Sequence, residues 1–203
     1  MSERYFITGI GTGIGKTMVS AILTEKLQAD YWKPIQSGDL AQSDSLTVKN
    51  LLTNPKSIVH PERYRLNQPL SPHLSAKLDG IGIELTSFQI PPTNNNLIVE
   101  GAGGLMVPLN DKHLLLDLIK YLNMPVIIVA NNYLGSINHT LLTINTLKQH
   151  NIQIKGIIFN GEANIESEQY ILNYTQVAHL GSIPALNPLN KITIIEAGKR
   201  LII

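Results

Sequence analysis

The 203-residue sequence contains no cysteine, which excludes a disulfide scaffold and any metal site built on thiolates. An excess of either charge is also missing, since 16 lysines and arginines stand against 15 aspartates and glutamates. A broad basic surface for nucleic acid or membranes, or an acidic tail, is therefore not expected. The longest apolar runs, such as residues 125–130, are too short to span a bilayer. We therefore expect small-molecule partners, with no nucleic acid and no membrane.

Two further absences concern location and metals. The N-terminal residues lack a charged segment followed by an apolar signal core, and a cytoplasmic protein is expected. The six histidines are scattered, without H-x3-H or H-E-x2-H spacing, so a histidine-based metal site is not expected. Hydrophobic residues make up 43% of the chain and no linker-like stretch divides it. The sequence therefore predicts a single domain over residues 1–203.

Short apolar runs recur along the chain and predict strands that are covered on both faces. They cover residues 5–8, 31–35, 97–99, 126–130, 154–159 and 180–183. Helix-like segments cover residues 18–27, 45–52, 71–78, 84–88, 113–122, 136–149 and 166–178. This alternation predicts an α/β fold, a doubly wound and mostly parallel sheet. Prolines interrupt residues 54–95, where only residues 71–78 and 84–88 are predicted to be helical.

The segment GIGTGIGKT, residues 9–17, lies between the first predicted strand and the first predicted helix. Glycines let successive backbone N–H groups converge on phosphate oxygens, and the helix N-terminus adds free donors. Lys16 would neutralise the β- and γ-phosphates, and the Thr17 hydroxyl would bind Mg²⁺. The spacing from Gly9 is G-x5-G-K-T, because Ile10 stands where the general P-loop pattern has glycine. The dinucleotide pattern G-x-G-x-x-G does not fit, so a P-loop NTPase-like fold is predicted.

Ligands of such sheets collect at the carboxyl ends of the strands. Glu100 follows the apolar run 97–99 and begins a second glycine-rich turn over residues 100–104. An acidic residue there is the expected Mg²⁺ partner of Thr17, and the glycines allow close backbone approach. The alternative is a solvated carboxylate at a loop mouth. It is disfavoured because an ion beside a buried strand costs several kcal/mol without compensation.

The run 31–35 is followed by further polar residues. Lys33 would be a second cation near a transferred phosphoryl group, and Ser37 a hydroxyl for the substrate. Taken alone, Lys33 reads as a surface lysine, and Ser43 or Asp44 as an ordinary helix N-cap. Their positions relative to the G-K-T loop favour the functional interpretation.

Together these segments resemble the dethiobiotin synthetases, the ATP-dependent enzymes that close the ureido ring in biotin synthesis. The resemblance spans nearly the whole chain. In order, its segments are Thr8-Gly9 with Thr12 and Gly15-Lys16-Thr17; Lys33-Pro34 with Ser37-Gly38; Ser43-Asp44; Ser71-Pro72-His73; Val99-Glu100-Gly101-Ala102-Gly103-Gly104; Leu134-Gly135 with Ile137-Asn138-His139; Asn160; and Gly181 with Ile183-Pro184.

The resemblance implies sites for ATP and for Mg²⁺. The ATP phosphates would be wrapped by Gly13, Ile14, Gly15, Lys16, Thr17 and Met18, with Gly101, Ala102 and Gly103 close by. The residues that border the nucleotide base would be Asn160, Gly161, Pro184, Ala185 and Leu186. Thr17, Asp44 and Glu100 would hold Mg²⁺, and Lys33 would be the catalytic lysine, assisted by Lys16.

The resemblance also implies the reaction and an assembly. Such enzymes join 7,8-diaminononanoate, CO2 (or bicarbonate) and ATP into dethiobiotin, ADP and phosphate, through a carbamate and a carbamic-phosphoric anhydride. Thr12 and Ser37 would face the diamine. The enzyme would be a homodimer in which the substrate's tail carboxylate meets the partner subunit. That carboxylate would be bound at Gly135, Ser136, Ile137, Asn138 and Tyr170. Independently, Ser136 opens a predicted helix, and a helix N-terminus suits a carboxylate.

The chain departs from the family pattern at two glycines. Relatives commonly carry Asp where Gly11 stands and often an acidic residue where Gly13 stands, so the roles of those side chains are absent. The loop between Lys33 and Asp44 and the tail beyond Pro184 look shorter than in many relatives.

Three other classes of protein could carry a similar glycine-rich loop. A partitioning or placement ATPase switch carries a signature lysine where this chain has Gly11. An amidating synthetase of the cobyrinate type needs a glutamine-hydrolysing domain with a nucleophilic cysteine, and no cysteine is present. A non-enzymatic nucleotide-binding module would be favoured if the diamine failed to stimulate ADP release.

Overall fold

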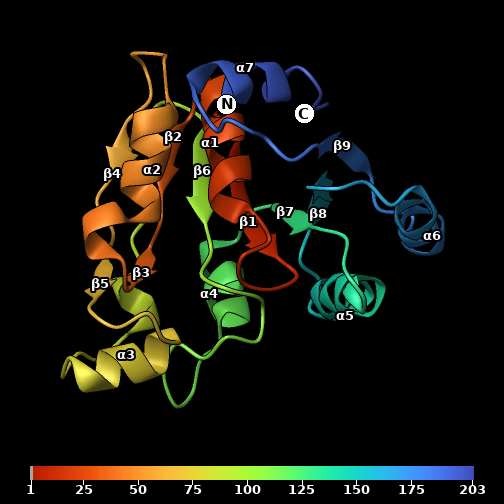
Figure 1. The fold of residues 1–203 in the computed structure, drawn as a ribbon. Helices are drawn as coiled ribbons and strands as arrows, with labels where there is room; N and C mark the ends of the chain where they lie inside the picture. Colours follow the sequence, from red (N-terminus) through yellow and green to blue (C-terminus); the bar gives the residue numbers. More distant parts are fainter. Residues whose placement is uncertain (1) are drawn as a thin grey trace.

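The computed structural model describes residues 2–203, in which strands and helices alternate along most of the chain (Figure 1). The strands are β1 (Arg4–Gly9), β2 (Asp30–Trp32), β3 (Ile35–Ser37), β4 (Val59–His60), β5 (Tyr64–Leu66), β6 (Leu97–Glu100), β7 (Val126–Ala130), β8 (Ile154–Asn160) and β9 (His179–Ile183). The α-helices are α1 (Lys16–Leu27), α2 (Asp44–Leu51), α3 (Pro72–Leu78), α4 (Leu115–Leu122), α5 (Ser136–Gln149), α6 (Ile165–Thr175) and α7 (Lys191–Gly198). Two short 3-10 turns are η1 (Leu40–Gln42) and η2 (Leu85–Ser87).

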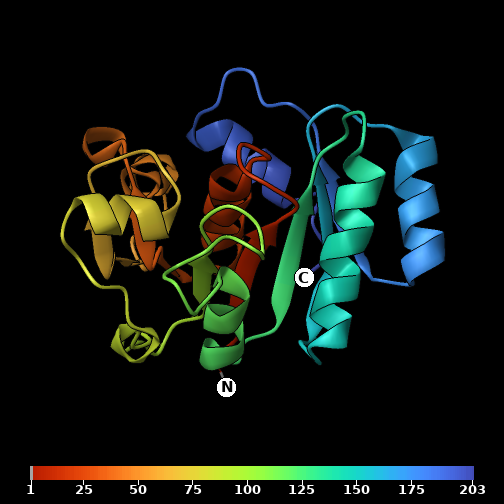
Figure 2. The same ribbon diagram turned by 90° about the horizontal axis from the view of Figure 1, so that it is seen from below.

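Seven strands form one parallel sheet in the order β4-β2-β6-β1-β7-β8-β9. Helices cover both of its faces, as Figure 2 shows. Tyr5 and Ile7 of β1 pack with α1, α2 and α7, whereas Phe6 packs on the opposite face with α4, α5 and α6. Successive residues of the central strand thus enter two different cores, which explains why the strand runs are apolar throughout. The doubly wound, mostly parallel α/β fold predicted from the sequence is confirmed.

The predicted strand over residues 31–35 is wrong as a single element. Proline has no N–H to donate to a sheet, and Pro34 separates β2 from β3. Its carbonyl accepts hydrogen bonds from the backbone N–H groups of Arg63 and Tyr64. The chain therefore leaves the large sheet at this point, and β3 pairs in parallel with β5 in a separate two-stranded sheet.

Two predicted helices have different ends in the structure. The helix predicted from residue 113 begins at Leu115, because Asn110 Oδ1 accepts the N–H groups of Lys112 and His113 in a turn. The helix predicted to reach residue 178 ends at Thr175, since Gln176 adopts the left-handed conformation with φ 56°. Most of the remaining predicted elements lie within two residues of the observed ones.

The middle segment contains more structure than the sequence predicted. The helix predicted over residues 71–78 is present as α3, but residues 84–88 form only the short turn η2. The strands β4 and β5 and the final helix α7 were not predicted. Among residues 2–203, no helix is long and apolar enough to cross a membrane.

Candidate active site

The glycine-rich loop, residues 10–15, lies at the carboxyl end of β1, between this strand and α1. Since β1 is flanked by β6 and β7, the loop sits at the centre of the sheet edge where ligands are expected. Gly15 has φ 93°, a conformation that side chains rarely adopt. A side chain there would also overlap the amide of Asn160. Glycine at this position is therefore required by the geometry of the loop.

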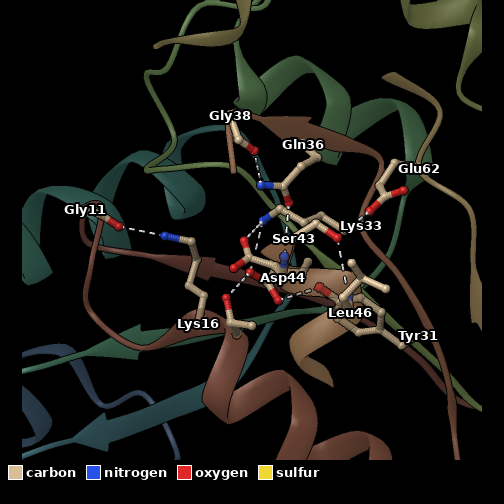
Figure 3. Close-up of polar contacts among 12 residues, drawn as sticks. Gly11, Lys16, Tyr31, Lys33, Gln36, Gly38, Ser43, Asp44, Leu46 and Glu62 are labelled. Atoms are coloured by element: carbon tan, nitrogen blue, oxygen red, sulfur yellow. Dashed lines mark hydrogen bonds and ion pairs between the residues drawn. The ribbon is translucent and has the colours of Figure 1, made fainter. Parts of the chain in front are cut away.

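Lys16 begins α1 and is buried. Its Nζ donates to the carbonyl oxygen of Gly11 at 2.7 Å, so the side chain folds back across the loop (Figure 3). Among residues 2–203 it makes no ion pair. The ammonium is thus held at the loop with its charge uncompensated by a directly bonded carboxylate.

A compact polar cluster lies beside this loop, formed by Thr17, Lys33, Asp44 and Glu100, of which Figure 3 labels Lys33 and Asp44. Glu100 Oε1 accepts from Thr17 Oγ1 at 2.8 Å and from Lys33 Nζ at 3.1 Å. Lys33 Nζ also contacts Asp44 Oδ2 at 2.7 Å. The structure therefore brings together four residues that the sequence picked out at four different strand or helix ends. We name them the acidic corner.

The charges in the acidic corner shift one another's pKa values. Burial lowers the pKa of Lys33, but Glu100 and Asp44 outweigh it and the pKa is raised overall. Burial raises the pKa of Asp44, yet the adjacent Lys33 ammonium and the Thr17 hydroxyl lower it below its ordinary value. Lys33 and Asp44 are therefore both charged at neutral pH.

The pKa of Lys16 moves in the opposite direction. Burial is the main cause, and together with the nearby Lys33 charge it lowers the pKa of Lys16 to about 8, despite the opposing effect of Glu100. Near pH 8 a substantial fraction of Lys16 is thus neutral.

This pKa predicts proton uptake when a triphosphate binds. Phosphate charges beside Lys16 raise its pKa, so binding above pH 8 must protonate the neutral fraction, and the apparent affinity falls as the pH rises. Calorimetry at about pH 8.5 in buffers of different ionisation enthalpy measures the uptake, which should be small at about pH 6.5, where the lysine is already charged. Lys16→Ala is the control and should lose this component; an unchanged proton uptake in it would contradict the assignment.

The donors of the acidic corner fit a Mg²⁺ ion. Mg²⁺ prefers oxygen ligands and is bound in phosphate sites by one or two carboxylates together with the phosphates and water. Asp44 and Glu100 supply carboxylates and Thr17 a hydroxyl, all at the loop that would hold the phosphates. Within residues 2–203 no group of three or more His, Cys, Asp or Glu residues gathers as for a metal held by protein alone.

Asn160 ends β8 on the other side of the loop. Its Nδ2 donates to the carbonyl of Ile14 at 2.9 Å, while its Oδ1 is buried and has no hydrogen-bond partner among residues 2–203. The backbone N–H of Gly161 donates to the carbonyl of Ile183, which brings the ends of β8 and β9 together. The segment that follows contains Pro184, Ala185 and Leu186. Of the predicted base-binding residues, Asn160 thus contacts the loop directly and carries a free acceptor, and Gly161 links it to the end of β9, which residues 184–186 follow.

The second glycine-rich turn packs directly on the first. The backbone N–H of Gly101 donates to Ile7 of β1 at 2.9 Å. A side chain on Gly103 would come within 3.6 Å of Thr12 Oγ1, and one on Gly104 within 3.4 Å of the Gly9 carbonyl. Ala102 lies between these contacts and is half-buried. The two turns therefore form one continuous surface.

The predicted diamine contacts lie on two different segments, the glycine-rich loop and β3. Thr12 is exposed on the glycine-rich loop. Ser37 ends β3, and its hydroxyl is buried without a partner among residues 2–203. Gln36 was not predicted: its Oε1 accepts from the Asp44 backbone N–H at 3.3 Å and its Nε2 donates to Gly38. Gln36 therefore ties the β3 segment to the start of α2.

The residues predicted for the substrate carboxylate separate into two groups. Gly135, Ser136 and Ile137 line a cavity of about 480 Å³, with polar neighbours from the loops after β7 and β8. Asn138 is exposed beside them. Tyr170 is not among the lining residues: it is exposed on α6 and stacks on Tyr174 with ring centroids 5.9 Å apart. Within one chain, the structure does not bring Tyr170 to this cavity.

Comparisons with known proteins identify the family. A family model described as an AAA domain matches residues 3–193. The ATP-dependent dethiobiotin synthetase BioD of Cytophaga hutchinsonii is 56% identical over 85% of this chain and 84% of that protein. The chain belongs to the ATP-dependent dethiobiotin synthetase family. Synthetases of the same name from Christiangramia forsetii and Rhodopseudomonas palustris are 50% and 45% identical, over 90% and 98% of this chain and 88% and 95% of theirs. The predicted family and enzyme class, an ATP-dependent ligase, are confirmed.

Comparison with solved structures shows which other proteins have the same fold as this chain. The septum site-determining protein MinD complexed with Mg-ADP, from Pyrococcus horikoshii, has a TM-score of 0.59 at 16% identity, covering 97% of this chain and 86% of that one. A putative plasmid partition protein from Borrelia burgdorferi bound to AMPPNP has a TM-score of 0.57 at 14% identity, covering 97% of both chains. At these identities the likeness is one of fold, and the predicted P-loop NTPase-like fold is confirmed.

Proposed function

We propose that this chain is a single-domain, ATP- and Mg²⁺-dependent ligase that converts 7,8-diaminononanoate and CO2 into dethiobiotin, releasing ADP and phosphate. The observation that carries the proposal is the acidic corner, in which Lys33 lies beside the proposed metal ligands at the mouth of the glycine-rich loop. The names of relatives at 45–56% identity support the substrate assignment.

The proposed ATP site runs along the glycine-rich loop. Backbone N–H groups of residues 13–18 would bind the phosphates, and the turn at residues 101–103 would border them. Thr17, Asp44 and Glu100 would hold Mg²⁺, which neutralises phosphate charge when bound. Asn160 and Gly161, with the segment at residues 184–186, would border the base, and the free Oδ1 of Asn160 suits an amino group as donor.

The proposed chemistry begins when one amine of the substrate adds to CO2 and loses a proton, which gives a carbamate. The carbamate oxygen attacks the γ-phosphorus and ADP leaves, forming a carbamic-phosphoric anhydride. The second amine then attacks the carbonyl carbon and loses a proton, and phosphate leaves as the ring closes. Lys16 and Lys33 oppose the repulsion between carbamate and γ-phosphate, the main obstacle to bringing two anions together. Thr12 and Ser37 would orient the diamine.

The substrate tail would extend toward the N-terminus of α5. Ser136 N–H already donates to the Tyr133 carbonyl at 2.9 Å. The next two amides, those of Ile137 and Asn138, are therefore the ones proposed to bind the tail carboxylate. Because Tyr170 lies outside the cavity of its own chain, its proposed contact fits a homodimer in which α6 of one subunit meets substrate at the other. The cytoplasmic location stays a prediction from the sequence.

One assay tests the proposal. The protein is incubated with ATP, Mg²⁺, bicarbonate and 7,8-diaminononanoate, and mass spectrometry follows the ring-closed product. We expect dethiobiotin and ADP in equal amounts, and no product when the diamine is omitted. ATP hydrolysis without product would overturn the proposal and favour the ATPase switch. Light scattering measures the oligomeric state, and a monomer at assay concentration would contradict the homodimer.

A further inference from the structure

Strand β2 and the residue that follows it direct two side chains toward one carboxylate. Alternate residues of a strand point to the same face, so Tyr31 and Lys33 emerge on one side of the sheet. The parallel register pairs Tyr31 with Ile98 of β6, and Tyr31 and Ile98 share the core beneath α1 and α2. Glu100, two residues after Ile98, lies on that same face. The pairing of β2 with β6 therefore directs both Tyr31 and Lys33, the residue just after β2, toward Glu100.

The two oxygens of Glu100 have different partners. Oε1 accepts from Thr17 and Lys33, whereas Oε2 accepts from the Tyr31 hydroxyl at 2.8 Å. Tyr31 is fully buried and Glu100 is 1% exposed, so water does not replace this bond. With Oε2 fixed by Tyr31, rotation of the carboxylate is restricted and Oε1 stays directed at the Thr17 hydroxyl.

Packing alone does not require the hydroxyl of Tyr31. Phenylalanine would fill the same apolar space in the core beneath α1 and α2, and a buried hydroxyl is unfavourable unless it is hydrogen-bonded. Among residues 2–203, the hydrogen bond to Glu100 is the one that the structure gives to this hydroxyl. The role of the Tyr31 hydroxyl is therefore its hydrogen bond to Glu100.

We propose that Tyr31 is a positioning residue that holds the Glu100 carboxylate in the orientation needed to bind Mg²⁺ through Oε1. The inference rests on the proposed function, in which Glu100 is a metal ligand. Residues that orient metal ligands commonly matter almost as much as the ligands themselves.

Tyr31→Phe tests this inference, with Tyr64→Phe as the matched control. Tyr64 is also a buried tyrosine, but its hydroxyl accepts from the Glu84 backbone N–H, in a contact that does not involve the acidic corner. With a non-hydrolysable ATP analogue at saturation, Tyr31→Phe should weaken Mg²⁺ binding about tenfold, and Tyr64→Phe should leave it unchanged. Calorimetry measures the affinity, and the fluorescence of Trp32, the single tryptophan, follows it independently. In turnover, the Mg²⁺ activation constant should rise about tenfold, while kcat at saturating Mg²⁺ stays within about twofold of wild type.

A third variant separates failure of this inference from failure of the proposed function. If Glu100→Gln binds Mg²⁺ like wild type, the metal assignment itself is wrong. If Glu100→Gln loses Mg²⁺ binding but Tyr31→Phe matches Tyr64→Phe, the positioning role is overturned. Should Tyr31→Phe fail to fold by circular dichroism, Tyr31→Gln and Tyr31→Leu replace it, because both shorten the side chain and only glutamine can donate. Equal Mg²⁺ affinities in that pair would also overturn the role.

Discussion

Lys33→Ala is expected to lower kcat about a hundredfold or more, since removal of one preorganised stabiliser of developing charge typically costs this much. The buried ammonium lies 2.7 Å from Asp44 and 3.1 Å from Glu100, at the mouth of the loop that would hold the γ-phosphate. Steady-state turnover with product detection by mass spectrometry gives the value. The exposed Lys26, on the last turn of α1, provides the matched control, and Lys26→Ala should turn over like wild type.

The same variant should also destabilise the free protein. Removing Lys33 leaves two carboxylates in the acidic corner without their cation, and breaking a buried ion pair typically costs about 3–5 kcal/mol. Mg²⁺ should recover part of that loss, because it replaces the missing positive charge. Denaturant unfolding with and without Mg²⁺ measures both quantities. Turnover within a few-fold of wild type in folded Lys33→Ala would rule out the role assigned to Lys33.

Lys16→Ala should weaken ATP binding about a hundredfold, the equivalent of losing one charge-assisted contact to phosphate worth about 3 kcal/mol. Its effect on the free protein should be opposite to that of Lys33→Ala. The lowered pKa of Lys16 shows that burial of its charge is not compensated, so its removal relieves an unfavourable interaction. The variant should therefore unfold at the same or a higher denaturant concentration than wild type.

Calorimetry with ATP in the absence of the diamine measures the affinity, and Lys26→Ala again serves as the control. Two lysines of the same site thus have opposite expected effects on stability. A destabilised Lys16→Ala, or one that binds ATP as tightly as wild type, would contradict the account of Lys16.

The features predicted best from the sequence were local ones. The glycine-rich loop could be predicted because strand, glycines, Lys16 and helix follow one another without a gap. Glu100 and Lys33 could be predicted to meet because the ends of parallel strands share one edge of a sheet. The prediction of the loop and the prediction that Glu100 lies near Lys33 both follow from rules that do not require knowing which strands are neighbours.

Features that depend on particular strand pairings were missed. The short strand β5 can be recognised as a strand only from its pairing with β3, whose residues precede their partners by 29 positions in the sequence. Tyr31 is predicted only as part of the apolar run 31–35, although its spacing of two from Lys33 places both side chains on the same face. Gln36 gave no signal, because its partner Asp44 is reached through a turn. In each case the missing information was the identity of the neighbour in space.

Pro34 divides the proposed catalytic machinery between two sheets. Lys33 is the last residue before the break and lies beside Glu100, whereas Ser37 ends β3 in the small sheet formed by β3 and β5. One proposed diamine contact, Ser37, is thus carried by a different sheet from Glu100, while the other, Thr12, lies on the glycine-rich loop itself. We therefore expect substitutions on β3 and β5 to alter the preference for the diamine, whereas substitution of Asp44, which lies between these two strands in the sequence, would also disturb the proposed Mg²⁺ site.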